Sequence, residues 1–305
     1  RWRYDERYLC HSPQERLFWQ GAWHEGLLPV DGVAPRTLAQ YELFARSVAQ
    51  EMDRAPFAMP SIRVWQRQGR LPAAHAALDG QTMQAWLTSQ GIDDAQLIWY
   101  LEYCCRDDFG AGLARVSAWA GIHYFASRHG FSAPRRQDER TPEDAGDAVL
   151  TWPQGNGWLS QQLVAGLGST DLQTDCSVLS IAESADGVEI DVYHHGRQQH
   201  ERWLAARCVV ALPSFIAARV VRDAPDFLRA VAGRLDWAPW LVANIHLQRP
   251  LADRPGADPA WDNVLFADPN AGGLGYVDAG HQGLDRLTPG PTVLSYYQAL
   301  GDWPD

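Results

Sequence analysis

Residues 150–168 read LTWPQGNGWLSQQLVAGLG, and the stretch continues to Pro213 through TDCSVLSI (174–181), GVEIDVYHH (187–195) and ERWLAARCVVALP (201–213). Its opening Pro and Gly residues predict a sharp turn into a short helix. Three runs rich in Val, Ile and Leu follow, with Gly and polar residues between them. They predict an antiparallel three-stranded meander over 178–181, 188–192 and 203–210. Pro213 then opens another helix in its first turn.

This order of turn, helix, meander and Ala-Leu-Pro exit resembles the middle of the flavin-containing amine oxidases and their phytoene-desaturase-like relatives. In that superfamily the stretch belongs to the FAD domain and lies between two halves of a substrate domain. Together with LTWPQGNGWL, two further stretches, WYLEYCCRDDFGAGLARVSAWAGIHYF (99–125) and LGYVDAGHQ (274–282), resemble a bacterial branch of FAD-dependent, NAD(P)-binding-like oxidoreductases with an amine oxidase domain. The resemblance covers most of the chain and implies FAD as the cofactor of the full-length protein.

The resemblance also implies which residues meet that cofactor. Val178 lies in the first meander strand, where a valine of the superfamily offers its backbone amide and carbonyl to the adenine of FAD. Ala211 and Pro213 end the third strand, where the superfamily's chain passes near the cofactor. The alternative for each is an ordinary structural role, as a buried strand valine or as the end of a strand.

The superfamily's dinucleotide-binding fingerprint is expected upstream of this stretch, and the chain shows none. GAGLAR at 110–115 begins like GxGxxG, but Arg115 replaces the third Gly and would block close packing of a helix on a strand. Asp107 and Asp108 just before it would repel a pyrophosphate. We therefore expect Gly110 to end a helix as a C-cap. We also expect the chain to be the central part of a longer enzyme and to be inactive by itself.

In the bacterial branch a Rossmann segment precedes this region, often behind a twin-arginine export signal. The resemblance therefore leaves two locations open, the cytoplasm and, after export, the periplasm.

The chain contains no Lys, and its 26 basic residues other than His are all Arg. This excludes Schiff-base, pyridoxal-phosphate and P-loop lysine chemistry. In amine-oxidising members of the superfamily a lysine holds a water beside the flavin N5, and Ala243 takes the corresponding position here. The departure disfavours amine oxidation proper and leaves desaturase-type or other carbon-chain oxidation open.

Charge and hydropathy limit the partners. A formal net charge of −11 disfavours nucleic acid and acidic membrane surfaces. No run approaches the ~18 consecutive apolar residues of a membrane span. The five cysteines form no CxxC, and His194-His195 lie at an expected hairpin turn, so we expect no metal site. The expected partner is a small-molecule substrate, while the oligomeric state and the electron acceptor stay open.

The remaining pattern predicts an α+β fold, with helices in the first half and strands in the second. A hairpin is expected over Arg7–Val30 with its turn at Ser12-Pro13. Helices are expected over 37–53, over 113–128 and near 225–234. A further helix is expected over 83–89, with Asp79 as its N-cap. Another is expected to run through Leu97 and Cys105, with Asp93 as its N-cap. Further strands are expected over 240–247, 261–266, 274–277 and 292–298.

The Pro-rich, charged stretch 131–147 and the change of pattern after Arg234 predict three segments. Residues 1–148 would form the first part of a substrate domain and residues 235–305 its second part. Residues 149–234 would form the middle segment of the FAD domain, with the meander.

The function that follows is a flavin-dependent oxidation, in which a hydride leaves a C–N or C–C bond of an organic substrate. Trp119, His123 and Tyr124 on the apolar helix 113–128 are the candidates to line the substrate cavity, against the alternative that His123 is an ordinary core histidine. The sequence assigns no catalytic acid or base. The rival functions are a non-catalytic binding module derived from the substrate domain and a structural or interaction protein that has lost the cofactor.

Overall fold

The computed structural model describes residues 3–5, 8–10, 15–128, 130–136, 149–152, 154–168, 172–266, 273–278, 280 and 290–303. The chain divides into two compact units. Unit 1 is Arg1–Pro153 together with Ala238–Asp305, and unit 2 is Gln154–Trp237. Their boundaries lie a few residues from the ones expected at 148 and 234. Within the described residues, none of the helices is both long and apolar enough to cross a membrane.

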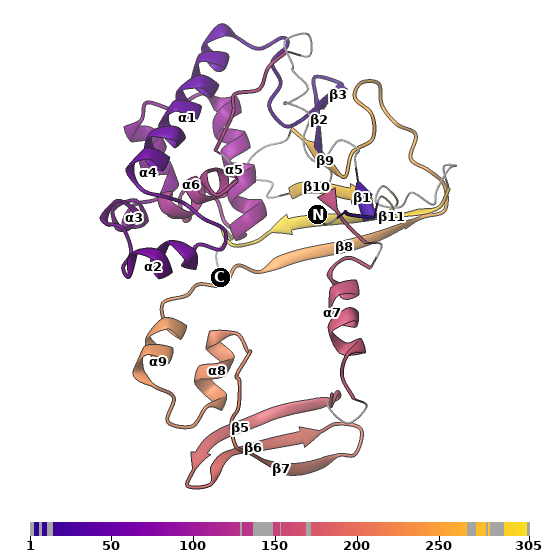
Figure 1. Cartoon of the computed structure of the whole chain (residues 1–305). Coiled ribbons are helices and arrows are strands. Elements are labelled where there is room, and N and C mark those ends of the chain that lie inside the picture. The colour runs from indigo at the N-terminus through magenta and orange to yellow at the C-terminus, as the bar shows by residue number, and fades with distance from the viewer. Residues whose placement is uncertain are drawn as a thin grey trace. The chain divides into compact units, whose positions relative to one another are not determined.

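Unit 1 contains a helical layer (Figure 1). The helices are α1 (Pro35–Arg54), α2 (Ile62–Gln68), α3 (Ala73–Asp79), α4 (Met83–Ser89), α5 (Ala95–Phe109) and α6 (Ala118–Ala126). α1 buries Tyr41, Phe44 and Val48, which recur every three or four residues and so form one apolar face. This face packs towards α5 and α6, where Phe44 meets Phe125 edge to face at 5.2 Å between ring centroids.

The main sheet of unit 1 has six described strands in the order β3-β2-β9-β10-β11-β8. They are β2 (Glu15–Trp19), β3 (Ala22–Glu25), β8 (Trp240–Leu247), β9 (Asp262–Leu265), β10 (Gly273–Asp278) and β11 (Thr292–Ala299). Neighbours are antiparallel except β2 and β9, which are parallel. The sheet therefore joins strands from both ends of the sequence, and α5 packs against β10.

Arg16 ties β2 to the strand beside it. Its Nε donates to Asn263 Oδ1 at 2.6 Å, and its guanidinium pairs with Asp253 at 2.9 Å. The same guanidinium lies 4.1 Å from the centroid of the Trp23 ring. Arg16 is 4% exposed, so this set of contacts forms a polar link inside the sheet.

Unit 2 contains an antiparallel meander, β5 (Cys176–Ser184), β6 (Gly187–His194) and β7 (Gln199–Ala205), in the order β5-β6-β7. Its helices are α7 (Asn156–Ala165), α8 (Ser214–Val220) and α9 (Asp226–Ala232). α8 packs on β5 and α9 packs on α8. Its buried apolar residues, as far as they are described, are Ile181, Val192, Ala217 and Ala224. Many larger apolar side chains are exposed instead, among them Val209 at 90% and Leu204 at 76%.

The expected α+β fold class, with a mixed helical and β unit and an antiparallel meander, is confirmed. The strand expected at 240–247 has the observed bounds. Gly110 ends α5 as a C-cap with a φ of 71°, as expected.

Several local predictions were wrong. The N-terminal hairpin joins β2 to β3, whereas β1 (Leu9–Cys10) pairs with β4 (Val149–Leu150), and the expected turn at Ser12-Pro13 lies outside the described residues. The N-cap of α4 is Thr82, because Asp79 is the last residue of α3. The expected helix over 113–128 begins only at Ala118.

The third meander strand also ends earlier than expected. β7 stops at Ala205, so Ala211 and Pro213 do not end a strand but lie in the connection to α8. Pro213 is the residue before the first helical turn.

Asp94, and not the expected Asp93, caps α5, which gives a prediction about stability. The Asp94 carboxylate accepts the backbone N–H groups of Gln96 and Leu97, both at 3.1 Å, and the Thr37 hydroxyl at 2.8 Å. Asp94→Ala should lower the free energy of unfolding by about 2 kcal/mol, because it removes a cap and leaves buried partners unpaired. Asp93→Ala, which removes only an exposed ion pair with Arg36, should cost under about 1 kcal/mol. Urea denaturation of the two variants checks this, and equal losses would contradict it.

Candidate functional site

Three carboxylates from separate elements of unit 1 act on one another. Glu15 starts β2 and Asp262 starts β9, and the two are register partners in the parallel pair. Partners in parallel strands project to the same face of a sheet, roughly 5 Å apart. Asp107 lies in the last turn of α5 and contributes to the pKa of both. The fold thus brings together acids that are about 90 to 250 residues apart in sequence.

Burial and mutual repulsion change the titration of these acids. Burial first, then Asp262 and Asp107, raise the pKa of Glu15 from 4.5 to about 7. Burial and Asp107 raise the pKa of Asp262 from 3.8 to about 7. The pKa of Asp107 is also raised, chiefly by burial and by Asp108, against a lowering contribution from Arg128. Two members of this carboxylate cluster of Glu15, Asp107 and Asp262, namely Glu15 and Asp262, are therefore partly protonated at neutral pH.

Two cavities adjoin the carboxylate cluster. One has a volume of about 370 Å³ and is lined by Asp107, Asp262 and the aromatic residues Tyr103, Trp240, Tyr276 and Tyr297. The other, of about 450 Å³, is lined by residues that include Glu15, Tyr100, Tyr124 and Arg128. Burial raises the pKa of Tyr100, Tyr103 and Tyr124 above its ordinary value, so their hydroxyls stay protonated and able to donate.

These features suit the binding of an organic molecule with a polar end. The aromatic side chains in the cavity walls supply apolar contact. The carboxylates and the Tyr hydroxyls supply hydrogen-bond acceptors and donors. Among the described residues, no group of three or more His, Cys, Asp or Glu side chains has the arrangement of a metal site.

The structure separates the three residues expected to line a substrate cavity. Tyr124 faces the 450 Å³ cavity beside Glu15, whereas Trp119 and His123 face a different, smaller cavity. His123 is only partly buried, and its Nε2 lies 3.0 Å from the Ala58 carbonyl oxygen.

Sequence reasoning missed the carboxylate cluster. The available signal was an acidic residue at the first position of two apolar strands, Glu15 before RLFW and Asp262 before NVL. That signal does not tell which strands become neighbours.

Val178, Ala211 and Pro213, the residues expected at the cofactor, all lie in unit 2. Val178 is on β5, the edge strand of the meander, and is 37% exposed. Ala211 is exposed, and Pro213 precedes α8, which packs on β5.

The hydrogen-bond pattern of the meander orients the backbone of Val178. The Ile181 carbonyl accepts the Arg222 N–H, so the backbone of Ile181 faces away from β6. In an antiparallel ladder alternate residues bond to alternate sides, which turns Asp191 of β6 towards β5 and Val192 towards β7. Val178 is opposite Val192, after an irregularity in register between Val178 and Ser180. The N–H and C=O of Val178 therefore point to the outer edge of β5.

Ala243, at the position where the resemblance implies a lysine, lies on β8 opposite Tyr296 of β11. β8 is the edge strand of the main sheet, and Trp240, Leu241, Val242 and Ile245 around Ala243 are exposed.

No known protein-family profile matches this sequence, and no curated protein matches it. Solved structures do share its fold. Putrescine oxidase bound to putrescine has a TM-score of 0.62 at 13% identity, over 96% of this chain and 58% of that chain. An oxidoreductase from Methanosarcina mazei has a TM-score of 0.53 at 14% identity, over 95% and 61% of the two chains. A protein from Pyrococcus furiosus has a TM-score of 0.55 at 11% identity, over 96% and 60%.

This chain thus spans about three fifths of the length of these structures. At such identities the likeness establishes the fold, which this chain shares with a putrescine oxidase and a further oxidoreductase.

Proposed function

We propose that this chain is the central part of an FAD-dependent oxidoreductase of the amine oxidase superfamily, with the adenine end of the cofactor at β5 of unit 2 and the substrate in the cavities of unit 1. The observation that carries the proposal is the shared fold over 96% of the chain with putrescine oxidase. Unit 2 would be the middle segment of the FAD domain, and the two parts of unit 1 would form the substrate domain.

The backbone at Val178 fits a role in holding FAD. A free N–H and C=O on an edge strand present the donor and acceptor that an adenine edge requires. The exposed apolar side chains of unit 2, such as Val209 and Leu212, are further surface for a cofactor or for protein that covers it. Ala211 and Pro213 lie in the same connection, next to these residues.

When bound, FAD would supply the hydride acceptor. The residues of this chain would position the substrate, with its apolar part against Trp240, Tyr276 and Tyr297 and its polar end at the carboxylate cluster. Because Glu15 and Asp262 have pKa values of about 7, they would hold or release a proton near neutral pH. We expect the reacting bond to be C–N or C–C.

The contact at Val178 is tested by removing one backbone donor in the full-length protein. Val178→Pro deletes the N–H that faces the outer edge, which the meander itself does not use. Loss of one hydrogen bond should weaken FAD binding about 3- to 10-fold. Val178→Ala, which keeps the N–H, is the matched control. The readout is the FAD dissociation constant from quenching of flavin fluorescence, and equal affinity of the two variants would exclude the contact.

The full-length protein should oxidise polyamines poorly, because Ala243 stands where amine-oxidising relatives are expected to have lysine. We expect spermine and benzylamine to reduce the bound flavin far more slowly than the enzyme's own substrate does. Stopped-flow absorbance of the flavin measures this directly. Reduction by either amine at a rate on the order of 10 s⁻¹, an ordinary turnover for enzymes, would show that the missing lysine does not decide the substrate.

A further inference from the structure

A third cavity, of about 200 Å³, lies in the helical layer of unit 1. It shares no lining residue with the two cavities at the carboxylate cluster. Its walls come from α2, α3, α6 and the segment before α2, and they are largely aromatic: Phe57, Trp65, His75, Trp119 and His123. None of its lining residues is an acid or an arginine.

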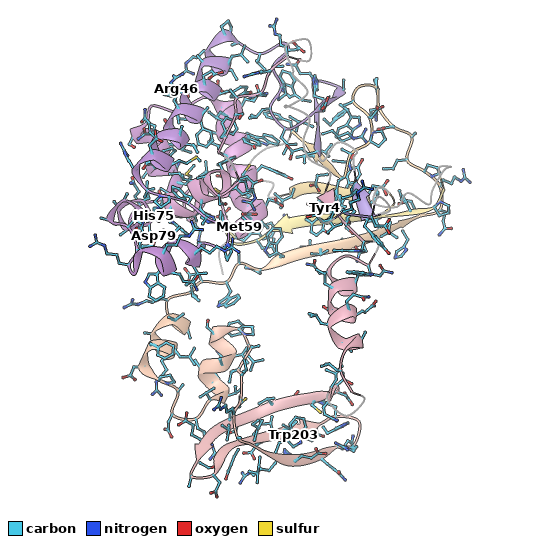
Figure 2. All side chains as sticks on the ribbon, in the orientation of Figure 1. Tyr4, Arg46, Met59, His75, Asp79 and Trp203 are labelled. Carbon is cyan, nitrogen blue, oxygen red and sulfur yellow. The ribbon has the colours of Figure 1, made fainter. Side chains whose placement is uncertain are left out.

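His75 is the unusual member of this wall. It is 2% exposed, and neither Nδ1 nor Nε2 has a hydrogen-bond partner. Figure 2 shows it on α3, a helix whose other described buried residue is Leu78. Buried polar atoms in proteins are nearly always paired, so two orphaned nitrogens on one ring need an explanation. Packing alone does not supply one, because Leu or Phe would fill the same space without the cost of an unpaired polar group.

Trp119, one turn before His123 on α6, also has a buried polar atom without a partner. Its indole Nε1 is buried and also lacks a hydrogen-bond partner. The Trp119 and His75 rings lie 6.1 Å apart between centroids, nearly edge to face. His123 differs, because its Nε2 is already engaged with the Ala58 carbonyl. Two neighbouring residues that line the cavity, His75 and Trp119, thus each carry a buried polar ring atom without a partner.

The protonation state of His75 limits the kinds of ligand that the cavity could bind. Burial and the neighbouring His123 lower the pKa of His75, which favours the uncharged imidazole at neutral pH. A neutral imidazole has one N–H donor and one bare nitrogen acceptor. Together with the Trp119 N–H, the two side chains therefore hold two unused donors and one unused acceptor. A cavity without a charged lining residue would not repay the desolvation of an ion.

From this geometry we infer that the His75 cavity is a binding site for a small, uncharged aromatic compound that carries a hydroxyl group, such as a phenol. Its ring would lie among Phe57, Trp65 and Trp119. Its hydroxyl would donate to the bare nitrogen of His75 and accept an N–H from Trp119 or His75.

The surface around the cavity provides an apolar approach. Ile62, Trp65 and Leu71 line the cavity, and each is 50–52% exposed. Met59, labelled with His75 in Figure 2, is 48% exposed and directly follows the lining residues Phe57 and Ala58. Half-exposed apolar side chains around a mostly aromatic pocket are typical of the mouth of a ligand site.

Fluorine NMR with three matched probes tests the inference on the unaltered protein. The probes are 4-fluorophenol, 4-fluorotoluene, which lacks the hydroxyl, and 4-fluorobenzoate, which is charged. We expect saturable binding of 4-fluorophenol with a dissociation constant on the order of 1 mM or below. 4-Fluorotoluene should bind about 3- to 10-fold more weakly, and 4-fluorobenzoate should not bind measurably. Equal binding of 4-fluorophenol and 4-fluorotoluene would overturn the inference, and so would the absence of saturable binding of 4-fluorophenol. The cavity would then be interpreted as a site for ordered water only.

Two variants place the binding in this cavity. Trp119→Phe keeps the ring and removes the indole N–H, and His75→Leu removes both ring nitrogens. Each should weaken 4-fluorophenol binding about 3- to 10-fold while leaving 4-fluorotoluene binding unchanged or stronger. Trp203→Phe, in unit 2, is the control for general loss of a tryptophan and should change neither. Because the probe series uses the unaltered protein, the inference stays testable even if a variant folds poorly.

Discussion

Replacing Glu15 by Gln should stabilise the protein above neutral pH and change its stability little in mild acid. Glu15 has a pKa of about 7 in the folded protein, raised from 4.5 by burial and by Asp262 and Asp107. A group whose folded pKa is raised binds more protons in the folded than in the unfolded state. Its favourable contribution is complete below pH 4.5 and is lost as the pH rises through 7.

The size of this effect follows from the shift. A rise from 4.5 to about 7 corresponds to at most about 3 kcal/mol of stability lost on going from acid to alkaline pH. Gln removes the charge but keeps the shape, so Glu15→Gln should recover up to that amount at ~pH 8 and almost none at ~pH 4. Glu42→Gln, at an exposed position on α1, should shift stability equally little at both.

Urea denaturation at the two pH values measures the difference directly. If Glu15→Gln showed the same pH dependence as the wild-type protein, the pKa of Glu15 would not be raised in the folded protein as described. Glu15 and Asp262 are only half-buried and Asp107 is exposed, so a ligand could reach the cluster. Acids kept at such a cost to stability are expected to have a use, which supports the proposal that the substrate binds beside them.

Replacing Arg16 by Met should produce the largest loss of stability among the changes considered. The Arg16 guanidinium bonds Asp253, and its Nε bonds Asn263, which precedes Val264 in the strand that begins at Asp262. It also donates to the Ala257 carbonyl at 3.0 Å. Met would fill similar volume but leave these acceptors without their donor. The Asp253 side chain is 41% exposed, so the loss comes mainly from the buried Asn263 acceptor and the Ala257 carbonyl. Leaving these groups unpaired should cost about 3 kcal/mol, a large part of the stability of an ordinary domain.

The matched control is Arg36→Met. Arg36 also pairs with a carboxylate, Asp93 at 2.6 Å, but both side chains are more than half exposed. That loss should stay below about 1 kcal/mol. Thermal unfolding followed by circular dichroism compares the two variants. An Arg16→Met variant as stable as Arg36→Met would mean that the link between β2 and β9 is not held by this side chain.

The sequence correctly predicted those helix ends and strands whose signal lies within a few neighbouring residues. Trp240–Leu247 alternates without interruption and has the bounds expected of it. Gly110 ends α5 because Gly adopts a positive φ without strain. By contrast, Asp93 and Asp94 are adjacent and equally suited to cap a helix, and both contact α1 in the fold, Asp93 through Arg36 and Asp94 through Thr37. The sequence pattern alone does not distinguish them.

The pairing of strands that lie far apart in the sequence could not be predicted from the sequence. Leu9 pairs with Leu150, and Glu15 is beside Asp262, although neither partner carries a signal of the other. The carboxylate cluster and the His75 cavity both depend on such pairings and on helix packing. For the same reason, the predicted cavity residues Trp119 and Tyr124 face different cavities, because they project from different sides of α6.

The visible absorption spectrum of the purified full-length protein shows whether these residues belong to a flavoenzyme, as proposed. The protein should be measured after incubation with FAD and desalting, beside the 305 residues expressed alone. We expect the bands of oxidised flavin, with one FAD per chain, in the full-length protein. We expect no retained flavin in the 305 residues alone, because a few backbone contacts at Val178 fall well short of the about 8 kcal/mol that micromolar binding requires. A full-length protein that stays colourless would exclude a flavoenzyme, and its fold would then serve binding without flavin chemistry.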